Sequence, residues 1–145
     1  VIDIMGDGIM VFWGGAKARS KDFMFKSIAA QNAGLCGIDL ITVIDSVVNK
    51  IIEKEDLGSP INIGVGIDYG NVIVSKIGIN DIYDVKAFGD CINTASKYAN
   101  EANKTVIVSK AIRDQWPQGK NGKIKFNSIA SKNGTAFNIY RESLK

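Results

Sequence analysis

Residues 1–13 read VIDIMGDGIMVFW, two short apolar runs on either side of Gly6-Asp7-Gly8. Apolar, β-prone residues flanking a glycine-rich pair predict a β-hairpin with a tight turn. A carboxylate on such a turn is well placed to hold a hard cation such as Mg²⁺, which prefers one or two carboxylates together with phosphate oxygens. Asp7 is therefore a candidate metal ligand. The alternative is that Asp7 is a solvated residue of an ordinary turn.

A long helix is expected after this hairpin. Apolar residues recur at helical spacing over about residues 22–55, and Gly58-Ser59-Pro60 ends the pattern. A helix of this length is unusual in a globular domain, so a break near Gly34–Gly37 is an open alternative. The apolar stripe predicts that the helix packs on one face of a sheet.

The rest of the sequence mixes strands and helices. The expected elements are a hairpin of Ile61–Asp68 with Val72–Ile77, a helix over Ile92–Ala102, a strand over Thr105–Ser109, a short helix over Lys110–Gln115, and a last hairpin of Lys123–Ile129 with Thr135–Tyr140. This mixture predicts an α+β fold with a mixed, mostly antiparallel sheet and helices on one face. The Asp7 hairpin is expected at the centre of that sheet.

Composition limits the class of protein. The 145 residues suit one domain, and 46% hydrophobic with 23% charged residues is typical of globular proteins. A net charge of +3 is too small to predict nucleic-acid or membrane binding. The absence of histidine excludes Ser-His-Asp and Cys-His hydrolases. With only Cys36 and Cys91 and no membrane-length apolar run, a cytoplasmic location is expected.

A second motif lies at residues 88–97, FGDCINTASK. Asn93 and Lys97 are four residues apart, which places both on one helix face near its N-terminus. Helix N-termini attract phosphates, and an amide one turn before a cation could hold a sugar oxygen and a phosphate. The alternative is an ordinary exposed helix face that Asp90 caps.

Together, these segments resemble the class III nucleotidyl (adenylate/guanylate) cyclase catalytic domain, from Val1 to about Tyr140. Gly6-Asp7 resembles the family's Gly-Asp hairpin, residues 63–72 (IGVGIDYGNV) its strand-turn-strand, and residues 89–96 (GDCINTAS) its "GDTVN-A" segment. The order of the three motifs also matches. The resemblance implies a ferredoxin-like cyclase core and a lyase that forms a cyclic 3′,5′-nucleotide and pyrophosphate.

The resemblance also implies roles for single residues. Members hold two Mg²⁺ or Mn²⁺ ions with two aspartates, and Asp7 matches the second of these. The first lies on a preceding strand, so residues 1–145 are expected to form a single cyclase domain that lacks its first strand. Asn93 matches the asparagine that orients the ribose. Lys97 stands where most members carry a transition-state arginine, and Lys132 resembles a phosphate-binding lysine.

Asp3 and Lys86 match the positions that read the base. Their charges reverse the pair found in adenylyl cyclases, and Asp3 resembles the acidic residue of guanylyl cyclases. An aspartate accepts from a base amine or imino group, and a lysine donates to a ring nitrogen or carbonyl oxygen. Cytosine and guanine offer that combination and uracil offers part of it. These departures resemble the bacterial pyrimidine cyclases of antiphage signalling (Pycsar type).

The sequence thus predicts a cytoplasmic, homodimeric cyclase with shared active sites, acting on CTP or UTP for second-messenger signalling. No contact with nucleic acid or a membrane is expected of this domain. An adenylate or guanylate cyclase, and an inactive cyclase homology domain with a regulatory role, stay open as alternatives. A diguanylate cyclase is disfavoured because its Gly-Gly-Asp/Glu-Glu-Phe hairpin is missing from the sequence.

Overall fold

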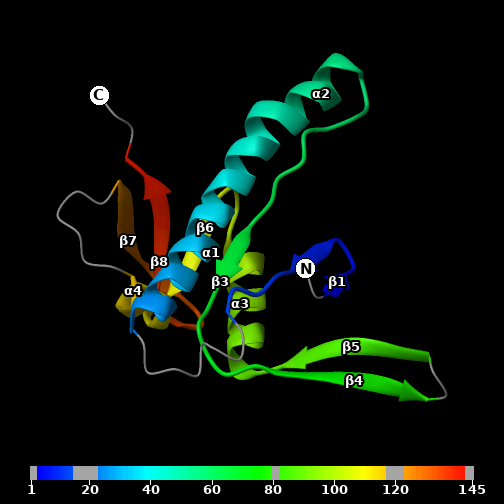
Figure 1. Ribbon diagram of the computed structural model, residues 1–145. Coiled ribbons are helices and arrows are strands. Elements are labelled where there is room, and N and C mark those ends of the chain that lie inside the picture. Colours follow the sequence, from blue (N-terminus) through cyan, green and yellow to red (C-terminus); the bar gives the residue numbers. More distant parts are fainter. Residues whose placement is uncertain (1–2, 15–22, 80–81, 117–122, 143–145) are drawn as a thin grey trace.

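The computed structural model describes residues 3–14, 23–79, 82–116 and 123–142 (Figure 1). Its elements in chain order are β1 (Asp3–Met5), β2 (Gly8–Met10), α1 (Phe23–Val43), the π-helical turn η2 (Ile44–Val48), α2 (Asn49–Lys54), β3 (Val65–Ile67), β4 (Ile73–Ile79), β5 (Ile82–Phe88), α3 (Asp90–Glu101), β6 (Val106–Ser109), α4 (Lys110–Gln115), β7 (Ile124–Ser131) and β8 (Gly134–Arg141). None of the helices in these ranges is both long enough and apolar enough to cross a lipid bilayer.

The main sheet contains four strands in the order β3-β6-β8-β7. β3 and β6 are parallel, while β8 pairs antiparallel with both β6 and β7. The expected last hairpin is confirmed as β7–β8, and the pairing of Ser131 with Gly134 leaves Lys132 and Asn133 as its turn. The predicted α+β class and the mixed, mostly antiparallel sheet are therefore confirmed.

Helices cover both faces of this sheet. α1 and α4 bury one face in a cluster made of Ala30, Ile38, Val106, Val108, Ile112, Trp116 and Ile139. Tyr98 of α3 packs with Ile107 and Ala136 in a second cluster. Because successive residues of a strand point to opposite faces, Val106 and Ile107 place these clusters on the two sides of β6. The expectation that all helices lie on one face of the sheet is therefore wrong, because α3 lies on the face opposite to α1 and α4.

The long helix is confirmed over Phe23–Lys54, counting η2 as part of it. It has no break at Gly34 or Gly37, and the structure shows what these glycines do. A Cβ on Gly34 would lie 2.6 Å from the Trp116 ring, and one on Gly37 would lie 3.1 Å from methyl groups of Val65 and Val106. Glycine here allows α1 to approach the sheet and α4 closely. The irregularity of the helix lies further along, in the π turn.

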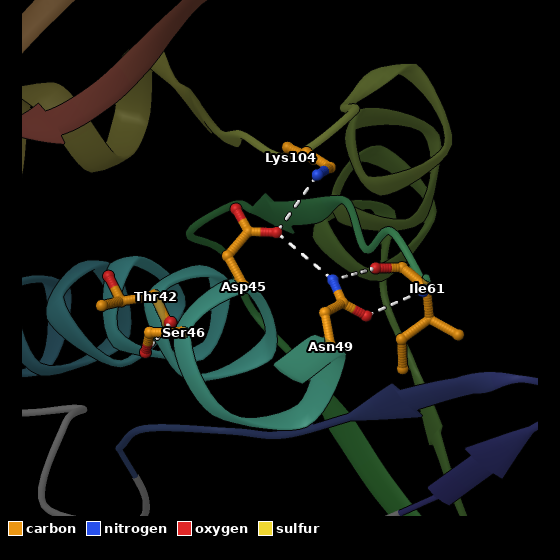
Figure 2. Close-up of polar contacts among 6 residues, drawn as sticks. All are labelled: Thr42, Asp45, Ser46, Asn49, Ile61 and Lys104. Atoms are coloured by element: carbon orange, nitrogen blue, oxygen red, sulfur yellow. Dashed lines mark hydrogen bonds and ion pairs between the residues drawn. The ribbon is translucent and has the colours of Figure 1, made fainter. Parts of the chain in front are cut away.

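A polar cluster follows this π turn and ties the helix to two other segments (Figure 2). The Asn49 amide donates to the Ile61 carbonyl at 2.9 Å and accepts from the Ile61 backbone N–H at 2.8 Å. The Asp45 carboxylate accepts from Asn49 at 3.4 Å and from the Lys104 ammonium at 3.2 Å. The end of the helix is thereby fixed to the segment that enters β3 and to the loop after α3.

One expected pairing is wrong. Residues 61–68 and 72–77 do not form a hairpin: β3 pairs with β6, and β4 pairs with β5 from Ile79↔Ile82 to Ile73↔Phe88. β3 pairs in the main sheet and is partly buried along its length, while β4 is exposed along its whole length. The β4–β5 hairpin therefore extends away from the main sheet (Figure 1).

The Asp7 hairpin is also not at the centre of the main sheet. β1 and β2 form a two-stranded sheet of their own, with Asp3 opposite Met10 and Met5 opposite Gly8. In the described part of the chain, β2 pairs only with β1, so no strand links the hairpin to β6. An ion pair of Asp3 with Lys86 connects this hairpin to β5.

Candidate functional site

Asp7 occupies a tight turn that its two strands hold in place. Pairing of Met5 with Gly8 leaves Gly6 and Asp7 as the turn, and Gly6 has a φ of 61°, a conformation that favours glycine. The Asp7 side chain is exposed. The local sequence therefore folds as predicted and presents the carboxylate to solvent at a fixed place.

Asp3 and Lys86 are brought into direct contact, although 83 positions separate them in the sequence. The Lys86 ammonium lies 3.0 Å from an Asp3 carboxylate oxygen and 2.8 Å from one of Asp84. The hydrogen bonds with Asp84 and then Asp3 raise the pKa of Lys86, and the bond with Lys86 lowers the pKa of the Asp84 carboxyl. Both shifts favour the charged forms of Lys86 and Asp84. Sequence reasoning foresaw Asp3 and Lys86 and missed Asp84.

Asn93 and Lys97 lie one turn apart on α3, and both side chains are exposed. The start of this helix is crowded: a Cβ on Gly89 would lie 2.5 Å from the Asn71 carbonyl oxygen, and the Cys91 thiol reaches the same carbonyl at 3.8 Å. Burial raises the pKa of Cys91, which disfavours a nucleophilic thiolate there. The segment 68–72 thereby fixes the end of α3 that carries Asn93.

Lys132 lies on the β7–β8 turn, which is fastened to α3. The Asn133 amide donates to the Glu101 carboxylate, and the Tyr98 hydroxyl donates to the Asn133 carbonyl at 3.5 Å. Tyr98 is one of the most buried side chains of the protein. The turn with Lys132 is therefore held against the same helix that presents Lys97. Glu101 and Asn133 are further residues that sequence reasoning missed.

Four of the predicted residues are free to meet a ligand. Within the described ranges, no side-chain hydrogen bond or ion pair involves Asp7, Asn93, Lys97 or Lys132, and all four are exposed. The part of the chain that the structure describes also contains no group of three or more His, Cys, Asp or Glu side chains that could hold a metal ion. A single exposed carboxylate such as that of Asp7 is compatible with a hard cation that takes one or two carboxylates and completes its shell with phosphate oxygens.

Known proteins resemble this chain in sequence. The family model of the adenylate and guanylate cyclase catalytic domain matches residues 1–128. A protein of Staphylococcus aureus named cytidylate cyclase is 32% identical over 109 residues, which are 72% of this chain and 24% of that protein. The chain thus spans about a quarter of the length of this relative.

Solved structures show a similar fold. The guanylyl cyclase Cya2 superposes with a TM-score of 0.68 at 19% identity, covering 94% of this chain and 67% of that one. The guanylate cyclase domain of RhGC from Catenaria anguillulae, solved in complex with GTP, superposes with a TM-score of 0.59 at 20% identity over 81% of this chain and 61% of that one. The family match and the shared fold lead to one conclusion: this chain belongs to the adenylate and guanylate cyclase catalytic domain family.

Proposed function

We propose that this domain is a nucleotidyl cyclase that converts a pyrimidine nucleoside triphosphate, CTP ahead of UTP, to the cyclic 3′,5′-nucleotide and pyrophosphate. The observation that carries the proposal is the contact of Asp3 with Lys86, since an aspartate and a lysine side by side can accept from and donate to one base edge. The relative named cytidylate cyclase supports the choice of base. The cyclic nucleotide would act as a second messenger in antiphage defence, in the cytoplasm.

In the reaction, the ribose 3′-oxygen loses its proton to water and bonds to the α-phosphorus, while the bond between the α-phosphorus and the oxygen that bridges it to the β-phosphate breaks and pyrophosphate leaves. Asn93 orients the ribose, and Lys97 and Lys132 neutralise charge on the phosphates as it develops. Asp7 would contribute a carboxylate to hold Mg²⁺ or Mn²⁺, two ions in all, which would supply charge neutralisation and lower the pKa of the attacking hydroxyl. Asp3 and Lys86 hold the base.

We also propose that the domain works as a homodimer with shared active sites, in which Asp7 of one chain faces Asn93 and Lys97 of the other. Exposed apolar side chains on the β4–β5 hairpin support an interface: Ile73, Val74, Ile77, Ile79 and Phe88. An apolar surface of this kind is typical of protein–protein contacts.

The test is to incubate the protein with each of the four ribonucleoside triphosphates and Mn²⁺, and to quantify the cyclic products. We expect CTP to be cyclised fastest, UTP next, GTP as the main competitor and ATP poorly. Each buried polar group left unpaired by the wrong base costs about 1–3 kcal/mol, enough for roughly ten- to hundredfold discrimination.

Asp3→Ala should reduce this preference more than it lowers the rate with a poor substrate. The matched control is Asp39→Ala. Asp39 also forms an ion pair, 2.8 Å from Arg141, but its partner is the last residue of β8. A preference for ATP, or a ranking of the four nucleotides that Asp3→Ala leaves unchanged, would show the assignment of the base site to be wrong.

A regulatory domain without activity is the second candidate. It is favoured by Lys97, because lysine lacks the rigid fork of donors that the family's arginine offers to a phosphate. Nucleotide binding without any cyclic product in the assay above would favour this second function.

A further inference from the structure

The ammonium of Lys86 is shared between two carboxylates from different strands. Asp84 and Lys86 are two residues apart on β5 and therefore lie on the same face of the strand. The Asp84 carboxylate lies 2.8 Å from the ammonium, closer than that of Asp3 at 3.0 Å. Because an ammonium has three donors, it can bond to both at once.

The two carboxylates differ in their exposure. The Asp3 side chain is 15% exposed, and that of Asp84 is 69% exposed. A sheltered carboxylate that loses its partner has little water to replace it, whereas an exposed one is solvated in any case. Separating Lys86 from Asp3 thus leaves Asp3 in need of a donor, while Lys86 keeps a partner in Asp84.

We propose that Asp84 is a positioning residue that determines base specificity: it retains Lys86 as an ion-pair partner when a nucleobase comes between Lys86 and Asp3. This inference rests on the proposed function of Asp3 and Lys86 as the base site. With Asp84 present, a base that offers an N–H to Asp3 replaces the broken contact, and Lys86 is still oriented to donate to the base. A base without that N–H leaves Asp3 unpaired and is rejected.

The consequence concerns binding rather than chemistry. Without the Asp84 charge, Lys86 has Asp3 as its remaining carboxylate partner of the two, so the preferred base, which bonds to both side chains, must break that pair in order to bind. Asp84→Asn should therefore raise KM for the preferred triphosphate by roughly two- to fivefold, the size expected for an exposed ionic contact. kcat should change less than about twofold, because Asp84 contacts no group assigned to the phosphates or the metal.

The experiment measures KM and kcat for all four ribonucleoside triphosphates, and also the dissociation constants of their 3′-deoxy analogues, which lack the attacking hydroxyl. The matched control is Asp114→Asn, because Asp114 is likewise an exposed carboxylate, 53% exposed and 2.6 Å from the Lys110 ammonium, and lies on α4. Asp84→Asn should weaken binding of the preferred analogue and narrow the spread among the four, whereas Asp114→Asn should leave both unchanged.

Two further variants separate a positioning role from a structural one. In a Lys86→Ala background, Asp84→Asn should have no additional effect, since Asp84 acts only through Lys86. Asp84→Glu, which keeps the carboxylate, should restore part of the affinity. Unchanged dissociation constants in Asp84→Asn, or an equal loss with and without Lys86, would overturn the inference. Binding of the analogues without turnover of the substrates would instead count against the proposed function. The dissociation constants of the analogues would still test the positioning role of Asp84.

Discussion

Asp7 owes its exposed position to the turn on which it lies. The two short strands fix Gly6 and Asp7, and the exposed carboxylate has no hydrogen-bond or ion-pair partner among the residues that the structure describes. A carboxylate in this situation costs little to redirect toward a cation, because no ion pair must be broken first. If Asp7 binds the metal as proposed, its removal should impair metal binding and leave the fold intact.

Asp7→Asn is therefore expected to lower kcat/KM by about a hundredfold or more, since a bound metal ion supplies several kcal/mol of charge stabilisation. The melting temperature should stay within about 2 °C of the wild type, because the side chain is exposed and buries little surface. Asp56→Asn is the matched control: Asp56 is also an exposed turn carboxylate, with a φ of 50° that asparagine tolerates. Wild-type rates for Asp7→Asn at limiting Mn²⁺ would identify Asp7 as a turn residue only.

Single residues were predictable from the sequence where a local motif carried them. The turn of Asp7 and the face shared by Asn93 and Lys97 follow from spacing alone, and the structure reproduces both. Asp84 was missed because its strand was not foreseen; once β5 is known, its spacing of two from Lys86 places both on one face. The contact of Asp3 with Lys86 depends on how two distant hairpins approach, which no local pattern encodes.

Helices and strands were predicted correctly from the sequence where local interactions determine them. The short helix α4 matches its expected range of Lys110–Gln115, and the long helix ends within a residue of expectation. The pairing of β3 was mispredicted because a Tyr-Gly-Asn turn between two apolar runs satisfies every local rule for a hairpin, while its real partner, β6, lies about 40 residues further along. The spacing of Gly64 and Gly66 is the sequence signal that was missed. Glycines at alternate positions leave one face of a strand without side chains, so that a helix can pack closely on it.

The missing side chain at Gly66 allows a test of how α3 is positioned against β3. A Cβ on Gly66 would collide with the carbonyl oxygen of Ala95 and the backbone nitrogen of Ala99, so α3 itself would have to move. Gly66→Ala should cost about 2 kcal/mol or more of the free energy of unfolding, as overpacking against a rigid backbone does. Because α3 carries Asn93, activity should fall as well.

The matched comparison is Gly37→Ala on α1. Its Cβ would meet side-chain methyl groups at 3.1 Å, and alanine gains about 1 kcal/mol of helix propensity over glycine. Urea unfolding should therefore show a much smaller loss for Gly37→Ala than for Gly66→Ala. Equal losses would mean that the close approach of β3 to α3 is not what Gly66 provides.

For the whole molecule, the arrangement of groups supports the proposed sharing of each site between two chains. Lys97 and Lys132 belong to one region, because the Lys132 turn is fastened to α3 through Asn133 and Glu101. Asp7 belongs to a separate two-stranded sheet and shares no hydrogen bond with that region in the described part of the chain. A second chain could bring another copy of Asp7 to the α3 cations, and the exposed apolar β4–β5 hairpin offers a surface for such an assembly.

Mixing two inactive variants tests this arrangement directly. Asp7→Asn and Asn93→Ala each inactivate a homodimer, but a heterodimer with shared sites contains one site that has both residues intact. Random exchange should then restore about a quarter of the wild-type activity, because half of the dimers are mixed and each holds one intact site of two. Asn93→Ala mixed with Lys97→Ala is the control: both residues lie on α3 of the same chain, so no intact site can form. No recovery in the test, although subunit exchange is demonstrated by mass labelling, would show that each site is built within one chain. Recovery in the control equal to that in the test would show that Asn93 and Lys97 of one chain do not serve the same site.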